Sequence, residues 1–156
     1  MEPSCLAVWH SDAGDLVDDP RIERVADAMV TLAQLLERTP GYEPPDLSGH
    51  RVVAQPHCHE ASVLGWGDQE SLLRRTGASL VVLGGCCGLA GNFGVEQGHY
   101  DVSVAVAEDQ LLPALRGAPA DAIVLADGFS CRKQVSDLTG RAALTLAELL
   151  YAHRDR

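Results

Sequence analysis

Five cysteines carry most of the chemistry that this sequence makes available, and they are spread along its 156 residues. They are Cys5, Cys58, Cys86, Cys87 and Cys131. Their odd number, and the lack of a basic and apolar leader in the first residues, argue against a disulfide scaffold. We expect a reduced, cytoplasmic protein, a setting in which clustered cysteines more often bind metal or carry out redox chemistry.

The segment 84–94 (GGCCGLAGNFG) gives the strongest signal, because it places two adjacent cysteines among glycines. Glycines such as Gly85, Gly88 and Gly91 let the backbone approach a ligand closely, and exposed N–H groups can donate hydrogen bonds to the sulfur of a cluster. A phosphate-binding loop would need GxGxxG or GxxxxGKS/T before a helix, and this segment has neither pattern. The spacing favours metal or cluster ligation by Cys86 and Cys87.

Cys58 is flanked by histidines in the sequence His57-Cys58-His59-Glu60, all of whose side chains can bind metals. Neighbouring side chains of an extended chain point in opposite directions, so the whole tetrapeptide cannot reach one metal. Cys58 is the better candidate ligand. His57 and His59 are either hydrogen-bond partners behind the ligands or ordinary polar loop residues.

Cys131 lies where a predicted strand turns into a helix, and Arg132 follows it directly. A helix N-terminus and a neighbouring cation both favour the thiolate form of a cysteine, so we expect a lowered pKa for this thiol. His99 precedes another predicted helix. It either lines the site or packs against the start of that helix.

The elements that must position these residues alternate along the chain. Strands are predicted over residues 51–54, 79–84 and 121–126, and helices over 20–36, 68–76, 101–116 and 142–153. This alternation predicts an α/β fold, a small parallel sheet of about three to four strands with helices on both faces. Three of the cysteine sites follow the carboxyl ends of the strands, the edge where ligands bind in open α/β sheets. We therefore expect the thiols to converge there.

Composition excludes several classes of protein. The net charge of −10 argues against a general nucleic-acid binder, which needs a basic surface. No apolar run approaches the roughly 20 residues of a bilayer span. The motifs of serine hydrolases, zinc proteases and calcium-binding loops are not present. The length suits a single domain over residues 1–156.

Five segments in this order resemble the cysteine-rich CCG domain, in its second half, of the iron–sulfur FAD-linked oxidase family. They are residues 2–5 (EPSC), 57–59 (HCH), 85–94 (GCCGLAGNFG), 98–103 (GHYDVS) and 127–131 (DGFSC). The resemblance extends from Glu2 to about Leu150. The family includes iron–sulfur components of glycolate, D-lactate, D-2-hydroxyglutarate and glycerol-3-phosphate dehydrogenases, and the cysteine-rich component of heterodisulfide reductase.

The resemblance implies an electron-transfer module of an oxidoreductase, with electrons passing from a flavin to an iron–sulfur cluster, expected to be of the 4Fe–4S type. It implies that the five cysteines are the ligands, with Gly85, Gly88, Gly91, His57, His59, His99 and Arg132 around them. The heterodisulfide-reductase pattern ends in CxxC, whereas Arg132, Lys133 and Gln134 follow Cys131 here, so the cluster type stays open.

FAD is expected in the full-length protein or a partner subunit, together with a ferredoxin-like module, and no catalytic residue is assigned to this chain. The chain is expected to be a module of a larger protein. In isolation, the chain itself is expected to self-associate. Its location would then be cytoplasmic, or peripheral to the inner membrane through its partners. Two alternatives remain open: a structural domain in which the same cysteines hold zinc, and a fold that is stable without metal and has free thiols.

Overall fold

The computed structural model describes residues 2–154, and its centre is a three-stranded parallel sheet. The strands are β1 Arg51–Ala54, β2 Ser79–Val82 and β3 Ile123–Leu125, in the order β2-β1-β3. Val52 of the central strand pairs with Leu80 on one side and with Ile123 on the other. The predicted α/β class and all three strands are confirmed, although β2 and β3 are shorter than expected.

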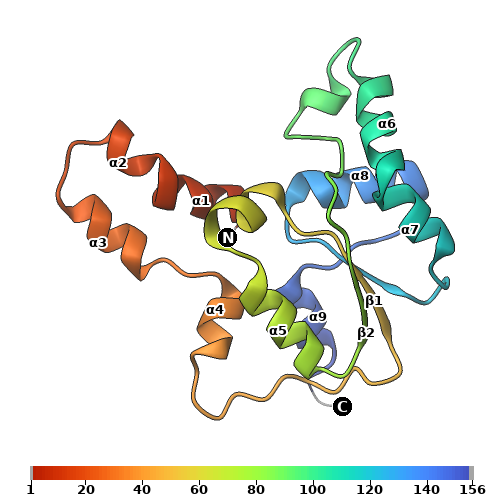
Figure 1. Cartoon of the computed structure of the whole chain (residues 1–156), viewed down its shortest axis with the longest axis horizontal. Helices are drawn as coiled ribbons and strands as arrows, with labels where there is room; N and C mark the ends of the chain where they lie inside the picture. Colours follow the sequence, from red (N-terminus) through yellow and green to blue (C-terminus); the bar gives the residue numbers. More distant parts are fainter. Residues whose placement is uncertain (1, 155–156) are drawn as a thin grey trace.

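Helices cover both faces of the sheet, as predicted (Figure 1). Side chains of a strand alternate between its faces, so β1 directs Val53 into one apolar cluster and Val52 and Ala54 into another. The first cluster includes residues of α6 Tyr100–Asp109, α7 Leu111–Gly117 and α8 Phe129–Thr139. The second includes residues of α4 Leu32–Glu37, α5 Gly67–Arg75 and α9 Leu146–Ala152.

The N-terminal segment forms helices that project from the sheet as an arm (Figure 1). They are α1 Pro3–Ser11, α2 Ala13–Leu16 and α3 Arg21–Ala28. Residues 2–5 form the N-cap and the first turn of α1. Glu2 is the N-cap of α1, its side chain accepts a hydrogen bond from the Ser4 N–H at 2.8 Å, and Pro3 occupies the first helical turn.

The helix predicted over residues 20–36 is two helices, α3 and α4, separated at Met29–Thr31. Thr31 ends the continuity because it starts a capping box: its side chain accepts from the Gln34 N–H, and the Gln34 side chain accepts from the Thr31 N–H. The apolar spacing continues through the break and therefore did not reveal it.

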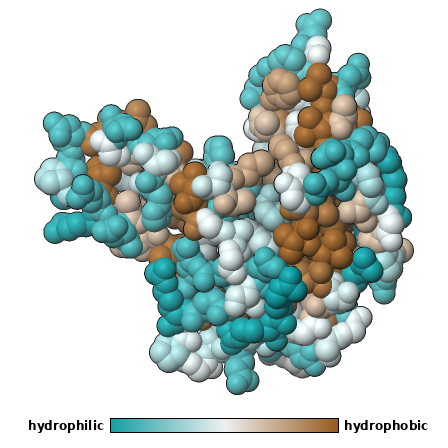
Figure 2. Space-filling model, viewed as in Figure 1, coloured by the Kyte–Doolittle hydropathy of each residue, from teal (hydrophilic) through white to brown (hydrophobic). Residues whose placement is uncertain are grey.

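The helix predicted over residues 101–116 is likewise divided, into α6 and α7, at Gln110. Leu112 and Leu115 of α7 are buried. In α6, Val102 and Val106 are exposed, whereas Ser103 and Ala107 are buried. Figure 2 shows apolar surface where α6 projects from the body.

The remaining elements differ from prediction mainly at their ends. Helix α9 begins at Leu146 rather than 142, because Leu144 pairs with Leu125 as an isolated bridge beside β3. Strand β2 lies at an edge of the sheet, and its residues Leu80–Val82 are half-buried. Two short helical turns, η1 Glu60–Leu64 and η2 Phe93–Val95, occupy the connections after β1 and β2. Within residues 2–154, no helix is long and apolar enough to span a bilayer.

Candidate functional site

Four of the five thiols line one cavity of about 390 Å³ at the carboxyl ends of the strands. They are Cys58, Cys86, Cys87 and Cys131. Each comes from the connection that follows a strand: Cys58 after β1, Cys86 and Cys87 after β2, and Cys131 in the first turn of α8 after β3. The predicted convergence at this edge of the sheet is therefore found for these four residues.

Cys58 and Cys86 form the outer pair of thiols. Their Sγ atoms are 3.7 Å apart, with Cys58 exposed and Cys86 half-buried. Burial of the sulfur, together with the neighbouring Cys86, raises the pKa of Cys58 to about 11. The Cys58 thiol therefore stays protonated until a positive centre compensates the charge of its thiolate.

Cys87 and Cys131 form an inner pair that belongs to the apolar cluster between the sheet and α6–α8. A hydrogen bond from the Cys131 thiol, with N–H groups of Leu89 and Ala90, lowers the pKa of Cys87 to about 6. The same hydrogen bond, followed by burial, raises the pKa of Cys131. The expectation of a lowered pKa at Cys131 is wrong, because its contact with Cys87 outweighs the helix N-terminus and Arg132.

The glycine-rich loop brings backbone N–H groups to the sulfur atoms. The Gly88 N–H donates to Cys86 Sγ at 3.3 Å. Gly88 has a φ of +92°, and a Cβ there would collide with the carbonyl oxygen of Ser103 on α6, so this position requires glycine. Gly91 lines the cavity, whereas Gly85 packs against Gln110 and its carbonyl accepts from Gln55 Nε2 at 2.8 Å.

His57 and His59 also line the thiol cavity, with their ring centroids 5.5 Å apart. Burial lowers the pKa of His57 and favours its neutral form. Its Nε2 lies 3.6 Å from Glu2 Oε1, while its buried Nδ1 has no hydrogen-bond partner among the described residues. The ring packs so closely on Gly128 that a Cβ at that position would overlap it. His57 is thus held in place beside the thiols.

Besides Gly85 and Gly88, three predicted site residues are not among the described residues that line this cavity. Cys5 is exposed on α1, one position after Ser4, which does line it. His99 stacks on Phe93 with ring centroids 4.2 Å apart, and Arg132 Nη1 lies 3.9 Å from Glu148. The roles of Cys5, His99 and Arg132 in cofactor binding stay predictions.

Glu2 is a residue of this site that the sequence analysis did not identify. Its carboxylate accepts from the Phe129 N–H at 3.1 Å and from Ser4, and so joins α1 to the start of α8. Burial alone would raise the pKa of Glu2, but these hydrogen bonds outweigh burial and lower it. The sequence signal that could have revealed this role is the pair Glu2-Pro3, because proline is common in the first turn of a helix and so marks the residue before it as a candidate cap.

The donor set fits an iron–sulfur cluster in its chemistry. Thiolates are the ligands of such clusters, and N–H donors to sulfur and limited solvent exposure adjust their potentials. Gly88 supplies such a donor to Cys86, and Leu89 and Ala90 supply donors to Cys87. Within residues 2–154, no three His, Cys, Asp or Glu side chains are already arranged around a point that could hold a single metal ion.

The chain is similar in sequence to bacterial enzymes named D-2-hydroxyglutarate dehydrogenase. It is 29% identical to the enzyme of Pseudomonas putida over an alignment that covers 100% of this chain and 15% of the relative. It is 36% identical to that of Pantoea ananatis and 33% identical to that of Escherichia coli K12, each over 60% of this chain and 9% of the relative. The chain thus spans less than a sixth of the length of the curated relatives that it matches.

No family model matches the chain. No solved structure matches it either.

Proposed function

We propose that this chain is an iron–sulfur electron-transfer module of a flavin-linked dehydrogenase that acts on a 2-hydroxy acid. One observation carries the proposal: four thiols from three separate strand ends line one cavity, and backbone N–H groups donate hydrogen bonds to the sulfur atoms of Cys86 and Cys87. Similarity to D-2-hydroxyglutarate dehydrogenases supports the substrate class.

Each part of the cavity has a separate task in this proposal. Cys58, Cys86, Cys87 and Cys131 supply thiolates, and Cys5 is a fifth candidate ligand from the neighbouring helix. A bound 4Fe–4S cluster would supply one-electron redox chemistry. Gly88 and its neighbours donate hydrogen bonds to sulfur, and the apolar cluster behind Cys87 and Cys131 excludes water. The hydrogen bonds raise a reduction potential by stabilising the more negative, reduced state, whereas exclusion of water lowers it, because a low dielectric disfavours the added charge.

Oxidation of the organic substrate belongs, on this proposal, to an FAD-containing domain or partner subunit. The chain would accept electrons from that flavin and pass them on, with a ferredoxin-like module as a further partner. This division of tasks agrees with the small share of the relatives' length that the chain spans.

Zinc is the second candidate occupant, and the outer thiol pair favours it. Two thiolates bound to tetrahedral zinc, with Zn–S bonds of about 2.3 Å, have sulfur atoms about 3.8 Å apart. The Cys58–Cys86 separation of 3.7 Å is close to this value. The size of the cavity, about 390 Å³, favours a group larger than one ion.

Metal and acid-labile sulfide analysis of protein purified under anaerobic conditions, with a visible absorption spectrum, tests the proposal. Iron and sulfide in similar amounts, with a broad visible band that bleaches on reduction, are the expected result. Stoichiometric zinc without colour would favour the structural role, because Zn²⁺ has no redox chemistry. A metal-free protein that takes up neither iron with sulfide nor zinc on anaerobic reconstitution would overturn both.

A further inference from the structure

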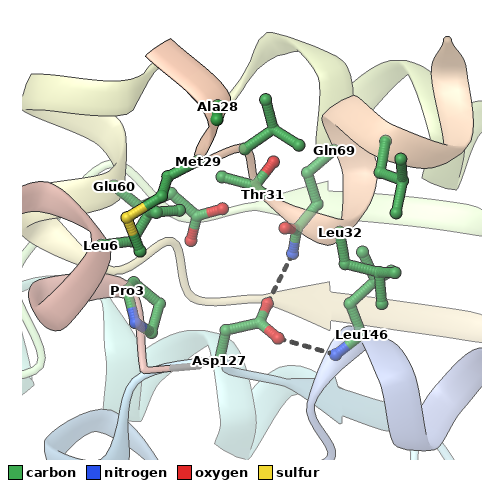
Figure 3. A pocket seen from close by; sticks show the side chains of 12 residues that line it. Pro3, Leu6, Ala28, Met29, Thr31, Leu32, Glu60, Gln69, Asp127 and Leu146 are labelled. Atoms are coloured by element: carbon green, nitrogen blue, oxygen red, sulfur yellow. Dashed lines mark hydrogen bonds between the residues drawn. The ribbon is translucent and has the colours of Figure 1, made fainter. Parts of the chain in front are cut away.

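A second cavity, of about 430 Å³, lies between the arm and the body of the molecule. Apolar side chains form much of its wall, among them Leu6 of α1, Met29 after α3 and Leu146 of α9. Pockets of this size with apolar walls and a few convergent polar groups are typical of small-molecule sites. Figure 3 shows polar side chains meeting inside it from η1, α5 and the loop after β3.

Two of those polar side chains are held firmly in place. Asp127 Oδ2 accepts from Gln69 Nε2 at 2.7 Å, and Asp127 Oδ1 accepts from the Leu146 N–H at 2.8 Å (Figure 3). The carboxylate is thereby fixed by one residue of α5 and one of α9. A polar group positioned in this way is suited to orient a ligand.

Glu60 is the third polar group, and it lacks a complete set of partners. Its side chain lines the cavity, the residue is 3% exposed, and Oε2 has no hydrogen-bond partner among the described residues. A buried oxygen without a partner costs about 1–3 kcal/mol, so a ligand that donates to it would recover that energy.

The charge in the cavity selects the kind of ligand. Two carboxyl groups, Glu60 and Asp127, line it, and none of the described lining residues is lysine, arginine or histidine. An anion such as a 2-hydroxy acid would meet repulsion here. A cation that donates hydrogen bonds would be attracted, and an apolar body would contact Leu6, Met29 and Leu146.

We propose that this cavity binds a small organic ammonium ion, with its N–H groups donating to Glu60 and Asp127 and its apolar part in contact with the leucine and methionine wall. The site is separate from the thiol cavity, since the two share no described lining residue. Its occupation does not depend on metal.

The test uses 2-phenylethylammonium as the probe, with neutral 2-phenylethanol and anionic 3-phenylpropionate as matched analogues. The chain has two methionines, so ¹³C-methyl-methionine NMR gives two signals, and Met29→Leu identifies the one from the cavity. The ammonium probe is expected to shift the Met29 signal in a saturable way, at a concentration at which the two analogues produce no saturable shift. A signal that none of the three moves, or that the neutral alcohol or the anion moves equally, would overturn the proposal.

Glu60→Gln is expected to weaken binding of the ammonium probe about tenfold or more, because the carboxylate that faces the ammonium is replaced by a neutral amide. The matched control is Glu70→Gln on α5, a half-buried position paired with Arg74 and outside the cavity lining, which should bind as the parent chain does. Equal affinity of Glu60→Gln and the parent chain would contradict the proposal. Leu35→Trp, at a 53% exposed wall position, is a second test that leaves Glu60 intact, and it should abolish binding by filling the cavity.

Discussion

Cys58 and Cys86 each follow, by the same number of positions along the sequence, one of two residues that pair with each other in the sheet. Ala54 of β1 pairs with Val82 of β2, and each cysteine follows its paired residue by four positions. Because the two strands are parallel and in this register, the connections that follow them reach the same level beyond the sheet, where the Sγ atoms lie 3.7 Å apart. The outer thiol pair is thus a consequence of strand pairing and equal loop length.

Replacing a buried thiol should remove the metal centre. Cys87→Ser is expected to lower the bound iron, measured per chain after anaerobic reconstitution, by about tenfold or more, since the ligand is lost from inside the apolar cluster. Cys5→Ser is the comparison, because Cys5 is exposed and outside the described cavity lining. We expect Cys5→Ser to retain most of the iron; an equal loss in both variants would establish Cys5 as a fifth ligand, and full retention in Cys87→Ser would contradict the proposed centre.

Gly88→Ala should destabilise the fold strongly. The φ of +92° disfavours an L side chain, and the new Cβ would collide with the Ser103 carbonyl of α6. Strain of this kind costs about 1–3 kcal/mol, so the free energy of unfolding should fall by at least that much. Urea denaturation measures it, with Gly117→Ala as control, since a Cβ at Gly117 meets nothing within 4 Å. Equal midpoints for the two variants would refute the predicted clash.

Asp127→Ala should weaken the junction between β3, α5 and α9. The substitution leaves the Leu146 N–H and the Gln69 amide without their acceptor. An unsatisfied buried donor costs about 1–3 kcal/mol, and a loss of that size in the free energy of unfolding is expected. Asp137→Ala, which removes an exposed partner of Lys133, should cost at most about 0.5 kcal/mol. Thermal or urea unfolding compares the two, and a larger loss in Asp137→Ala would be the contrary result.

The start of α9 should make stability depend on pH. Hydrogen bonds from the Thr145 N–H and hydroxyl hold the pKa of Glu148 below its usual value. A carboxyl group with a lowered folded pKa adds stability above its unfolded pKa of about 4.3, and this contribution is lost as the pH falls through the folded pKa.

Glu148→Gln removes the charge and keeps an acceptor at the helix N-terminus. It should lower the free energy of unfolding at pH 7 by about 0.5 kcal/mol. The difference from the parent chain should then shrink as the pH falls below about 4. Urea unfolding of both proteins across this range is the measurement. A gap that stays constant from pH 7 to pH 3 would show that the charge of Glu148 contributes nothing.

The sheet and the convergence of four thiols were predictable because they follow from patterns local to each strand. Three apolar runs separated by helical segments predict parallel strands, and parallel strands end at a common edge. Cys58, Cys87 and Cys131 could therefore be brought together without knowing any contact between them.

The features that were not predicted depend on interactions that apolar spacing does not record. Thr31 and Gln34 divide a stripe of leucines and valines by capping a new helix. The protonation of Cys131 is set by Cys87, which is remote in sequence. The second cavity needs Glu60 and Asp127, which β1 and β3 place on the same side of the molecule.

Cys58 and Cys86 are equally far along the chain from the paired residues Ala54 and Val82, so the lengths of the two connections determine whether the thiols meet. Adding or deleting one residue between Ala54 and Cys58, or between Val82 and Cys86, would move one sulfur atom along the strand direction and separate the two Sγ atoms. The opposite rim carries no such requirement, because the proline-rich loop over residues 39–49 enters β1 far from the thiols in the fold. Insertions, fluorescent labels and affinity tags should therefore be tolerated at the exposed residues 39–41 of that loop and rejected at the cysteine-bearing rim.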